Sequence, residues 1–354
     1  MSFRYKVALL GTIALLELSL STKADTLHKI AEIPIPGVAF ESYDTGLVLE
    51  GRFYLADRSN KSLDVFDIAT NTFLYMVPGF VGAGSGGLVG PNAMEVVNNG
   101  REIWVADGDS TIKIVDVAKR QIVDSVSTGG KKRVHAVAYD PKNGIFIVGN
   151  DADEPNFLTL VSTKPGHTIL AKIPLPRTEG VEQPLYRQAN GMFYIALPTL
   201  DRDEHKGGIA IVDPLKASLV KVIEIRDCQP HGLAEGRGDF IVVGCSAGSK
   251  ASKLPPMAAL FDAKAEKLVP ISDRMGGVDM VAYSKKLGLY VMGGREAPDG
   301  PSVALFDAES NKWIENIIIP PNPHSVTVDE ASGHVFVPSG VTGPCKGCLV
   351  VLGK

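Results

Sequence analysis

Histidines and carboxylates alternate at a regular interval along the chain. His135, His231 and His324, three of the seven histidines, alternate with Glu182 and Asp279. Neighbouring members of this series are roughly 45 residues apart, an interval typical of repeat architectures. Imidazoles combined with one or two carboxylates are common ligand sets for zinc, manganese and iron, and both residue types can move protons. The series therefore predicts chemistry if the fold brings its members together.

A second pattern with a similar spacing indicates the elements that position these residues. It is an apolar strand that ends in Asp, with one double step between its second and third clear copies. Repeats of about 40 to 50 residues, rich in Val, Ile, Tyr and Gly, are typical of β-propellers. The pattern therefore predicts an all-β, seven-bladed β-propeller. Its clearest copies are Phe66-Asp67, Val115-Asp116, Val212-Asp213, Phe261-Asp262 and Phe306-Asp307.

The two ends of the chain predict how the ring closes. The last blade reads as strands at 324–328, 335–337 and 349–352, one strand short of four. An unassigned strand at Lys29–Pro34 precedes the first inner strand, which begins near Phe40. We expect Lys29–Pro34 to supply the missing outer strand, because closure removes an exposed sheet edge.

The first 24 residues have the features of a secretory signal. Arg4 and Lys6 precede an apolar stretch at Val7–Leu20, and Thr22-Lys23-Ala24 resembles a cleavage site. We expect a signal peptide at 1–24, the alternative being a retained anchor, and a single propeller domain at 25–354. The expected location is the periplasm or outside the cell, with no membrane insertion of the mature chain. A net charge of −4 argues against nucleic acid as a partner.

The four cysteines fit an oxidising compartment. Cys228 and Cys245 bracket a predicted hairpin whose turn is Gly236-Arg237-Gly238, so we expect them to form a disulfide across its open end. Cys345 and Cys348 form a CxxC without a following His, which argues against covalent haem. A local disulfide, a redox role and metal binding all remain open for this second pair.

Several short motifs resemble a known group of propellers. The chain is similar, over essentially all of 25–354, to the YncE-like, YVTN-repeat seven-bladed propeller proteins of bacterial periplasms. That resemblance implies an architecture and no particular reaction. A more distant similarity to streptogramin B lyase, a seven-bladed propeller that opens a lactone with a divalent metal, implies a reaction class. The motifs are 54–60, 65–67, 104–110, 138–141, 182–184, 276–279 and 324–326.

Aligning the inner strands places one polar residue of each blade at the same level of the central channel. Because equivalent inner-strand positions surround one axis, these residues should converge into a polar ring at one channel mouth. We expect His135, His231 and His324 to be metal ligands, Glu182 to be a catalytic base and Asp279 to be catalytic or a fourth ligand. The predicted polar ring contains Asn92, His135, Glu182, His231, Asp279 and His324, with blade one contributing from 41–44.

The loops that follow the second strands should surround the same mouth, because inner and second strands form antiparallel hairpins. Loops on a rigid scaffold often carry binding residues. With Asn92 of the ring, Asp57, Arg58, Asp107, Asn150 and Arg295 from these loops are the predicted substrate contacts. Gly82–Gly90 lacks the Lys-Ser/Thr ending of a P-loop, so we expect no nucleotide cofactor.

Two functions remain open at this point. The first is a metal-dependent lyase or hydrolase acting on a small molecule, with a divalent zinc, manganese or iron ion as cofactor. The alternative is a non-enzymatic periplasmic propeller that binds a small ligand or a partner protein on the same face. For the ring itself, the options are metal chemistry, ligand recognition without metal, and a solvated channel lining. Whether the protein is an enzyme is open, and the enzyme is slightly favoured.

Overall fold

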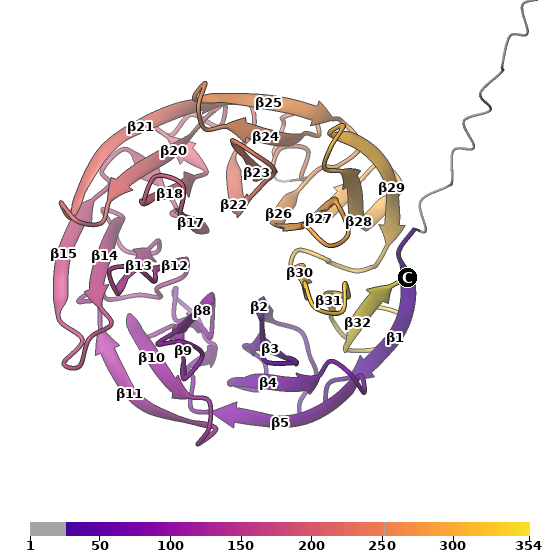
Figure 1. Ribbon diagram of the computed structural model, residues 1–354, viewed down its shortest axis with the longest axis horizontal. Coiled ribbons are helices and arrows are strands. Elements are labelled where there is room, and N and C mark those ends of the chain that lie inside the picture. The colour runs from indigo at the N-terminus through magenta and orange to yellow at the C-terminus, as the bar shows by residue number, and fades with distance from the viewer. Residues whose placement is uncertain (1–25, 251) are drawn as a thin grey trace, which may run out of the picture.

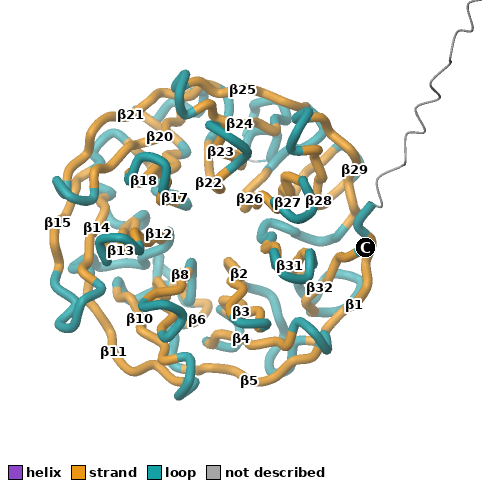
Figure 2. Tube along the Cα trace, viewed as in Figure 1, coloured by secondary structure: helices purple, strands orange, loops and turns teal. Residues whose placement is uncertain are grey.

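Seven sheets surround a central axis in the computed structural model, which describes residues 26–250 and 252–354 (Figure 1). Each sheet consists of four antiparallel strands, and Figure 2 shows that this part of the chain is built of strands and loops alone. The predicted all-β, seven-bladed propeller is confirmed. Two short ladders lie outside the blades, β6 (Gly82–Ala83) with β7 (Val89–Gly90), and β16 (Thr178–Glu179) with β19 (Thr199–Leu200).

From the axis outward, the strands of blades one to four are β2 (Tyr43–Leu49), β3 (Arg52–Asp57), β4 (Ser62–Asp67) and β5 (Thr72–Pro78); β8 (Met94–Val97), β9 (Glu102–Ala106), β10 (Thr111–Asp116) and β11 (Gln121–Ser127); β12 (Val137–Asp140), β13 (Ile145–Asn150), β14 (Phe157–Ser162) and β15 (Ile169–Pro174); β17 (Pro184–Arg187), β18 (Met192–Leu197), β20 (Lys206–Asp213) and β21 (Ser218–Arg226). Those of blades five to seven are β22 (Pro230–Glu235), β23 (Phe240–Cys245), β24 (Ala258–Asp262) and β25 (Lys267–Ser272); β26 (Val278–Ser284), β27 (Leu289–Ala297), β28 (Gly300–Asp307) and β29 (Lys312–Ile318); β30 (Thr327–Val328), β31 (Val335–Ser339), β32 (Cys348–Gly353) and β1 (His28–Pro34).

The first strand in the sequence closes the ring. β1 pairs antiparallel with β32, and Ile33 lies opposite Leu349 in that ladder. Both side chains are buried in one cluster. The N-terminal segment therefore completes the blade that contains His324, as the sequence predicts, with the strand beginning one residue earlier than expected.

The repeated apolar-Asp pair is explained by local turn chemistry. Each Asp ends a third strand, and its carboxylate accepts a hydrogen bond from a backbone N–H three residues later, as in other Asx turns. The preceding residue (Phe66, for example) is buried. The repeated Asp therefore has a structural role in the turn after the third strand. The five N–H to Oδ1 contacts are Thr70 to Asp67 at 2.8 Å, Lys119 to Asp116 at 2.8 Å, Lys216 to Asp213 at 3.0 Å, Ala265 to Asp262 at 2.8 Å and Ser310 to Asp307 at 2.7 Å.

The apolar core lies between neighbouring blades. One cluster packs Tyr54 and Val65 of blade one against Met94 and Ile103 of blade two, and similar clusters join the other blades. Because apolar burial supplies most of the driving force for folding, the blade interfaces carry the stability of the ring.

Both cysteine pairs form disulfides, Cys228 with Cys245 and Cys345 with Cys348. The predicted pairing across the hairpin is confirmed, and the CxxC forms a local disulfide. Disulfides are consistent with an extracellular or periplasmic protein. No helix within residues 26–250 and 252–354 is long and apolar enough to cross a membrane. The expected signal peptide at 1–24 lies outside the described residues.

Candidate functional site

Irregular pairing at the start of the inner strand positions the ring residues, with register shifts in blades one, five and six. In blade five, the ladder between β22 and β23 shifts register between Pro230 and Leu233, so His231 lies within the bulge. In blade three, the N–H of His135 donates to the carbonyl oxygen of Gly149 at 3.0 Å, outside the regular ladder. Bulges bend a strand and redirect its side chains. The regular inner strands therefore begin up to three residues later than the sequence indicates in most blades.

The same bulge identifies the ring residue of blade one. The ladder between β2 and β3 shifts register between Tyr43 and Gly46, which places Asp44 in the bulge, opposite Ala56. The range 41–44 therefore narrows to Asp44. From here on, the polar ring is Asp44, Asn92, His135, Glu182, His231, Asp279 and His324.

Small residues face the bulges because adjacent blades approach closely there. A Cβ on Gly244 would lie 2.2 Å from the carbonyl oxygen of Asp279 in the next blade, closer than real contacts allow. At the same level, the Met280 N–H donates to the carbonyl oxygen of His324 at 2.9 Å. These contacts between blades fix the backbone from which the ring side chains project. Six of the residues that face a bulge are Ala56, Ala106, Gly149, Ala196, Gly244 and Gly293.

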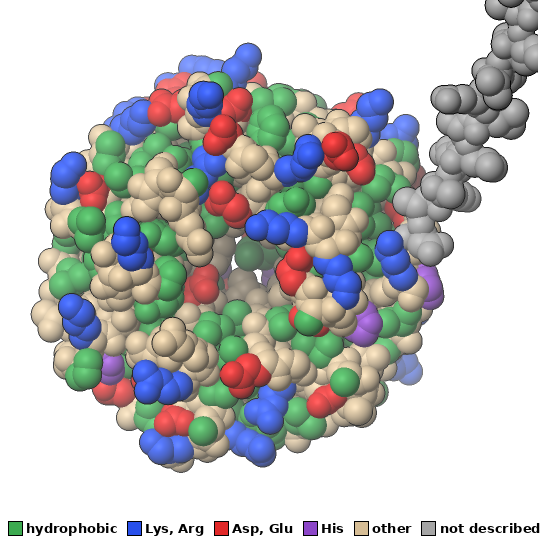
Figure 3. Space-filling view, in the orientation of Figure 1, with side chains coloured by type: hydrophobic (Ala, Val, Ile, Leu, Met, Phe, Trp, Pro, Cys, Tyr) green, Lys and Arg blue, Asp and Glu red, His purple; other side chains and the backbone are tan. Residues whose placement is uncertain are grey.

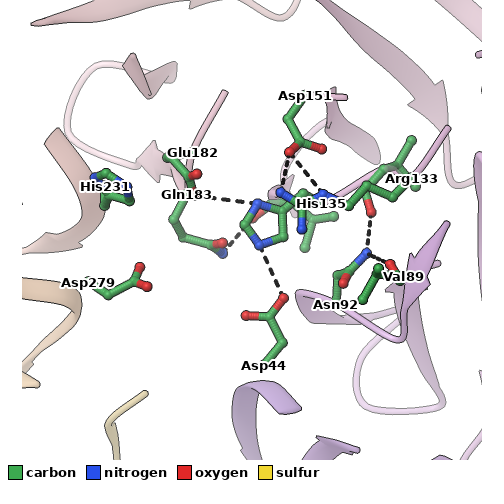
Figure 4. A network of polar contacts seen from close by, with 12 residues as sticks. Asp44, Val89, Asn92, Arg133, His135, Asp151, Glu182, Gln183, His231 and Asp279 are labelled. Atoms are coloured by element: carbon green, nitrogen blue, oxygen red, sulfur yellow. Dashed lines mark hydrogen bonds and ion pairs between the residues drawn. The ribbon is translucent and has the colours of Figure 1, made fainter. Parts of the chain in front are cut away.

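His135 lies between two carboxylates of the ring (Figure 4). Its Nε2 is 3.1 Å from Oδ2 of Asp44, and its Nδ1 is 3.4 Å from Oε2 of Glu182. The side chains are mostly buried: His135 is 14% exposed, Asp44 8% and Glu182 15%. Contacts between blades one, three and four therefore meet at one imidazole.

The opposite charges of His135 and its two carboxylate neighbours shift one another's pKa values. Burial lowers the pKa of His135, but the carboxylates of Glu182 and Asp44 outweigh it and raise that pKa to about 9. Burial opposes ionisation of Asp44, yet Arg58 and His135 hold its pKa below the ordinary value. Burial raises the pKa of Glu182, against the effects of His135 and His231. At neutral pH, His135 is therefore a cation that donates to Asp44 through Nε2.

Two arginines of the rim turn inward and pair with ring carboxylates. Arg58 forms an ion pair with Asp44, and its Nε donates to Oδ1 of Asn92 at 3.1 Å. Arg295 forms an ion pair with Asp279. Both were predicted substrate contacts, and the structure places both at the ring. The Nε of Arg295 is buried with no hydrogen-bond partner in the described part of the chain.

The other two ring histidines differ in hydrogen bonding. Nδ1 of His231 is 2.9 Å from the carbonyl oxygen of Gln229, which can only accept, so Nδ1 carries the proton and a neutral His231 presents Nε2 as an acceptor. Nδ1 of His324 is 3.1 Å from the amide nitrogen of Asn322, which donates, so Nε2 of His324 carries the proton. Burial lowers the pKa of His324, which keeps it neutral. Beside the charged pairs, the ring thus offers a donor on neutral His324 and, in the neutral form of His231, an acceptor.

Three other predicted substrate contacts have hydrogen-bond partners in the rim loops, Asp57 and Asp107 in their own loop and Asn150 in a loop of blade two. Asp57 accepts from the N–H of Asn60 at 3.0 Å, and Asp107 accepts from the N–H of Gly108 at 2.8 Å. Asn150 donates to Oγ1 of Thr128 at 2.8 Å. All three side chains are buried. The structure therefore places Asp57, Asp107 and Asn150 as supports of the rim loops.

The expected metal centre of His135, His231 and His324 stays a prediction. Among residues 26–250 and 252–354, no group of three or more His, Cys, Asp and Glu side chains is placed to hold a metal ion. The proton that two carboxylates hold on His135 would have to leave before that imidazole could bind a metal. We therefore derive no step through a metal at His135.

Two contributors to the site were not found from the sequence. Tyr43 stacks on His324, with ring centroids 4.8 Å apart, and Arg133 pairs with Asp151 at 2.5 Å beside Glu182 (Figure 4). Tyr43 directly precedes a bulge residue, so a correct register in blade one would have indicated it. The Arg133–Asp151 pair could not be found from neighbouring residues, because the two residues are 18 positions apart and lie in different loops.

Comparisons with known proteins identify the fold alone. No family model matches the chain, and no curated protein matches it. Among solved structures, the hydrazine synthase of Kuenenia stuttgartiensis is similar, with a TM-score of 0.71 and 12% sequence identity over 96% of this chain and 98% of that chain. At this identity the likeness supports a shared seven-bladed architecture and carries no activity across.

Proposed function

We propose that this protein is an exported β-propeller that binds a small, uncharged, hydrogen-bonding molecule in the polar ring. One observation carries the proposal: in a ring whose charged groups have partners, neutral His324 presents a donor, and the neutral form of His231 presents an acceptor. Rigid scaffolds with a few fixed polar groups are typical of small-ligand sites.

The charge balance of the ring supports an uncharged ligand. Asp44, Glu182 and Asp279 supply three negative charges, and Arg58, Arg295 and protonated His135 supply three positive charges. A free ion entering this ring would lose its hydration shell without meeting a net opposite charge. A neutral molecule with hydroxyl or amide groups would instead use the two histidines and the Nε of Arg295, which has no hydrogen-bond partner among the described residues.

Isothermal titration calorimetry with uncharged polyols, sugars and amides, beside carboxylate and ammonium analogues of each, tests this proposal. We expect an uncharged compound to bind, and we expect His231→Ala to weaken binding by about tenfold, the loss of one well-placed hydrogen bond. Asp273→Asn, at an exposed position outside the ring, should leave binding unchanged. A preference for the charged analogues, or binding that His231→Ala does not alter, would overturn the proposal.

A metal-dependent lyase or hydrolase is the second candidate. In its favour, the acceptor-bearing His231 lies near Glu182 and Asp279, as Figure 4 shows. Elemental analysis of protein purified without a histidine tag tests this candidate. A bound divalent metal that is lost in His231→Ala would favour the enzyme, and metal content that is equal in both proteins would reject it.

A further inference from the structure

A second cavity opens at the opposite end of the channel, beyond the polar ring. Its volume is about 510 Å³, within the range of small-molecule sites. It is lined by neighbouring inner strands, through Glu95 on β8, Tyr139 on β12, Tyr186 on β17, Leu233 on β22 and Met280 on β26. Figure 3 shows this face of the ring, with a hollow at its centre and acidic side chains close to it.

The lining of the cavity is acidic, aromatic and apolar. Two carboxylates, Glu95 and Glu235, contribute to it, and in the described part of the chain no Lys, Arg or His lines it. Glu235 is partly neutralised by Arg187, which approaches it to 3.3 Å from outside the lining. The remaining lining is largely apolar, so the carboxylate of Glu95 dominates the charge that a ligand would meet.

Glu95 is partly buried, and its carboxylate interacts with the backbone N–H of Val96 but has no ion-pair or side-chain hydrogen-bond partner in the described residues. Burial raises its pKa to about 7, because no neighbouring cation offsets the loss of water. A partly buried carboxylate without a charged partner would be stabilised by a cation that enters the cavity.

We propose that this cavity binds an organic ammonium compound whose charged nitrogen meets Glu95. The rings of Tyr139 and Tyr186 line the same cavity, and aromatic rings attract quaternary and protonated amines through their π faces. The apolar surface of Leu233 and Met280 suits the alkyl groups of such a compound, whereas a hydrated inorganic cation would gain nothing from it. This site is separate from the ring and does not depend on the function proposed for it.

Calorimetry with two matched probes tests the proposal: choline, and its neutral isostere in which carbon replaces the ammonium nitrogen. We expect choline to bind the full chain at least about tenfold more tightly than the isostere, because only choline carries the charge that Glu95 and the tyrosines attract. Glu95→Gln preserves the shape and should abolish this preference. Glu309→Gln, an exposed acid outside the cavity, is the matched control and should retain it.

A second variant separates a specific site from general attraction to an acidic surface. Tyr139→Leu should weaken choline binding several-fold and leave the weak binding of the isostere unchanged. Equal affinity for both probes, undetectable binding of choline, or choline affinity that Glu95→Gln leaves unchanged would each overturn the proposal.

Discussion

Two sets of polar residues occupy repeated positions in the blades, and they differ in residue type and in bonding. The Asp residues at the third-to-fourth strand turns keep one residue type and make the same bond to a backbone N–H. The polar ring changes residue type from blade to blade, and its members bind one another across blades.

The pKa values follow the same division. Hydrogen bonds from the Ser310 hydroxyl and N–H lower the pKa of Asp307, and backbone N–H groups do the same at Asp67. In the ring, burial raises the pKa of Glu182 while Arg58 and His135 hold that of Asp44 low. The constant Asp at the strand turns therefore belongs to the construction of the blade. The polar ring, whose residue type varies from blade to blade, is the better candidate for a functional site.

The largest effect is expected from Asp44→Asn. The substitution removes the charge that pairs with both Arg58 and His135, and leaving partly buried cations without a partner is costly. We expect the free energy of unfolding to fall by about 3 kcal/mol, measured by urea denaturation. Asp273→Asn, at an exposed position, should change it by less than about 0.5 kcal/mol. Equal effects of the two substitutions would break the distinction between ring and surface acids.

The next effect concerns pH. The pKa of His135 is raised from 6.5 to about 9 in the folded state, so its stabilising contribution is complete below about pH 6.5 and is lost as pH rises through about 9. We expect stability to fall by about 2 kcal/mol between about pH 7 and pH 10. In Asp44→Asn this decline should be smaller, because one of the two carboxylates that hold the proton is gone. A flat profile in the native protein would place His135 in its neutral form.

A smaller loss is expected when a turn carboxylate is removed. Asp307 accepts from the N–H of Ser310 at 2.7 Å and from its hydroxyl at 2.6 Å, so Asp307→Ala should cost about 1 kcal/mol. Asp307→Asn keeps an acceptor and should recover most of that loss. Neither variant should change ligand binding in the ring. An effect of Asp307→Ala on binding would contradict the assignment of this Asp to architecture.

The smallest effect on stability is expected for His231→Ala. His231 is only partly buried, its one hydrogen bond is to Gln229, and the blade interfaces do not depend on it. We expect a change below about 0.5 kcal/mol in thermal or urea unfolding. A loss as large as that of Asp44→Asn would show that the neutral histidines hold the ring together, and it would weaken the case for ligand binding.

The sequence predicted the repeated part of the structure well because that information is local. The bond from an Asp to an N–H three residues later, the alternation of a strand and the missing strand of the last blade can all be read from neighbouring residues. The segment Lys29–Pro34 was assigned for this reason, and it closes the ring. Its pairing with β32 could be predicted because the last blade has only three strands of its own.

The side-chain partners at the axis were harder to predict. Rim residues at similar positions had different outcomes: Arg58 and Arg295 turn into the ring, whereas Asp57 bonds within its own loop and Asn150 bonds to a loop of blade two. Each outcome depends on a bulge and on the blade beside it, and neither leaves a local signal.

By itself, the sequence determined seven blades, the closing strand, the Cys228–Cys245 disulfide and the six ring positions from Asn92 to His324. Only the tertiary structure decided that Asp44 completes the ring, that His135 lies between two carboxylates, and that Glu95 lies in a cavity without a cation. The reason is physical. A turn or a strand is fixed by residues a few positions apart, but the charge on an imidazole depends on groups that only the closed ring brings within a few ångströms.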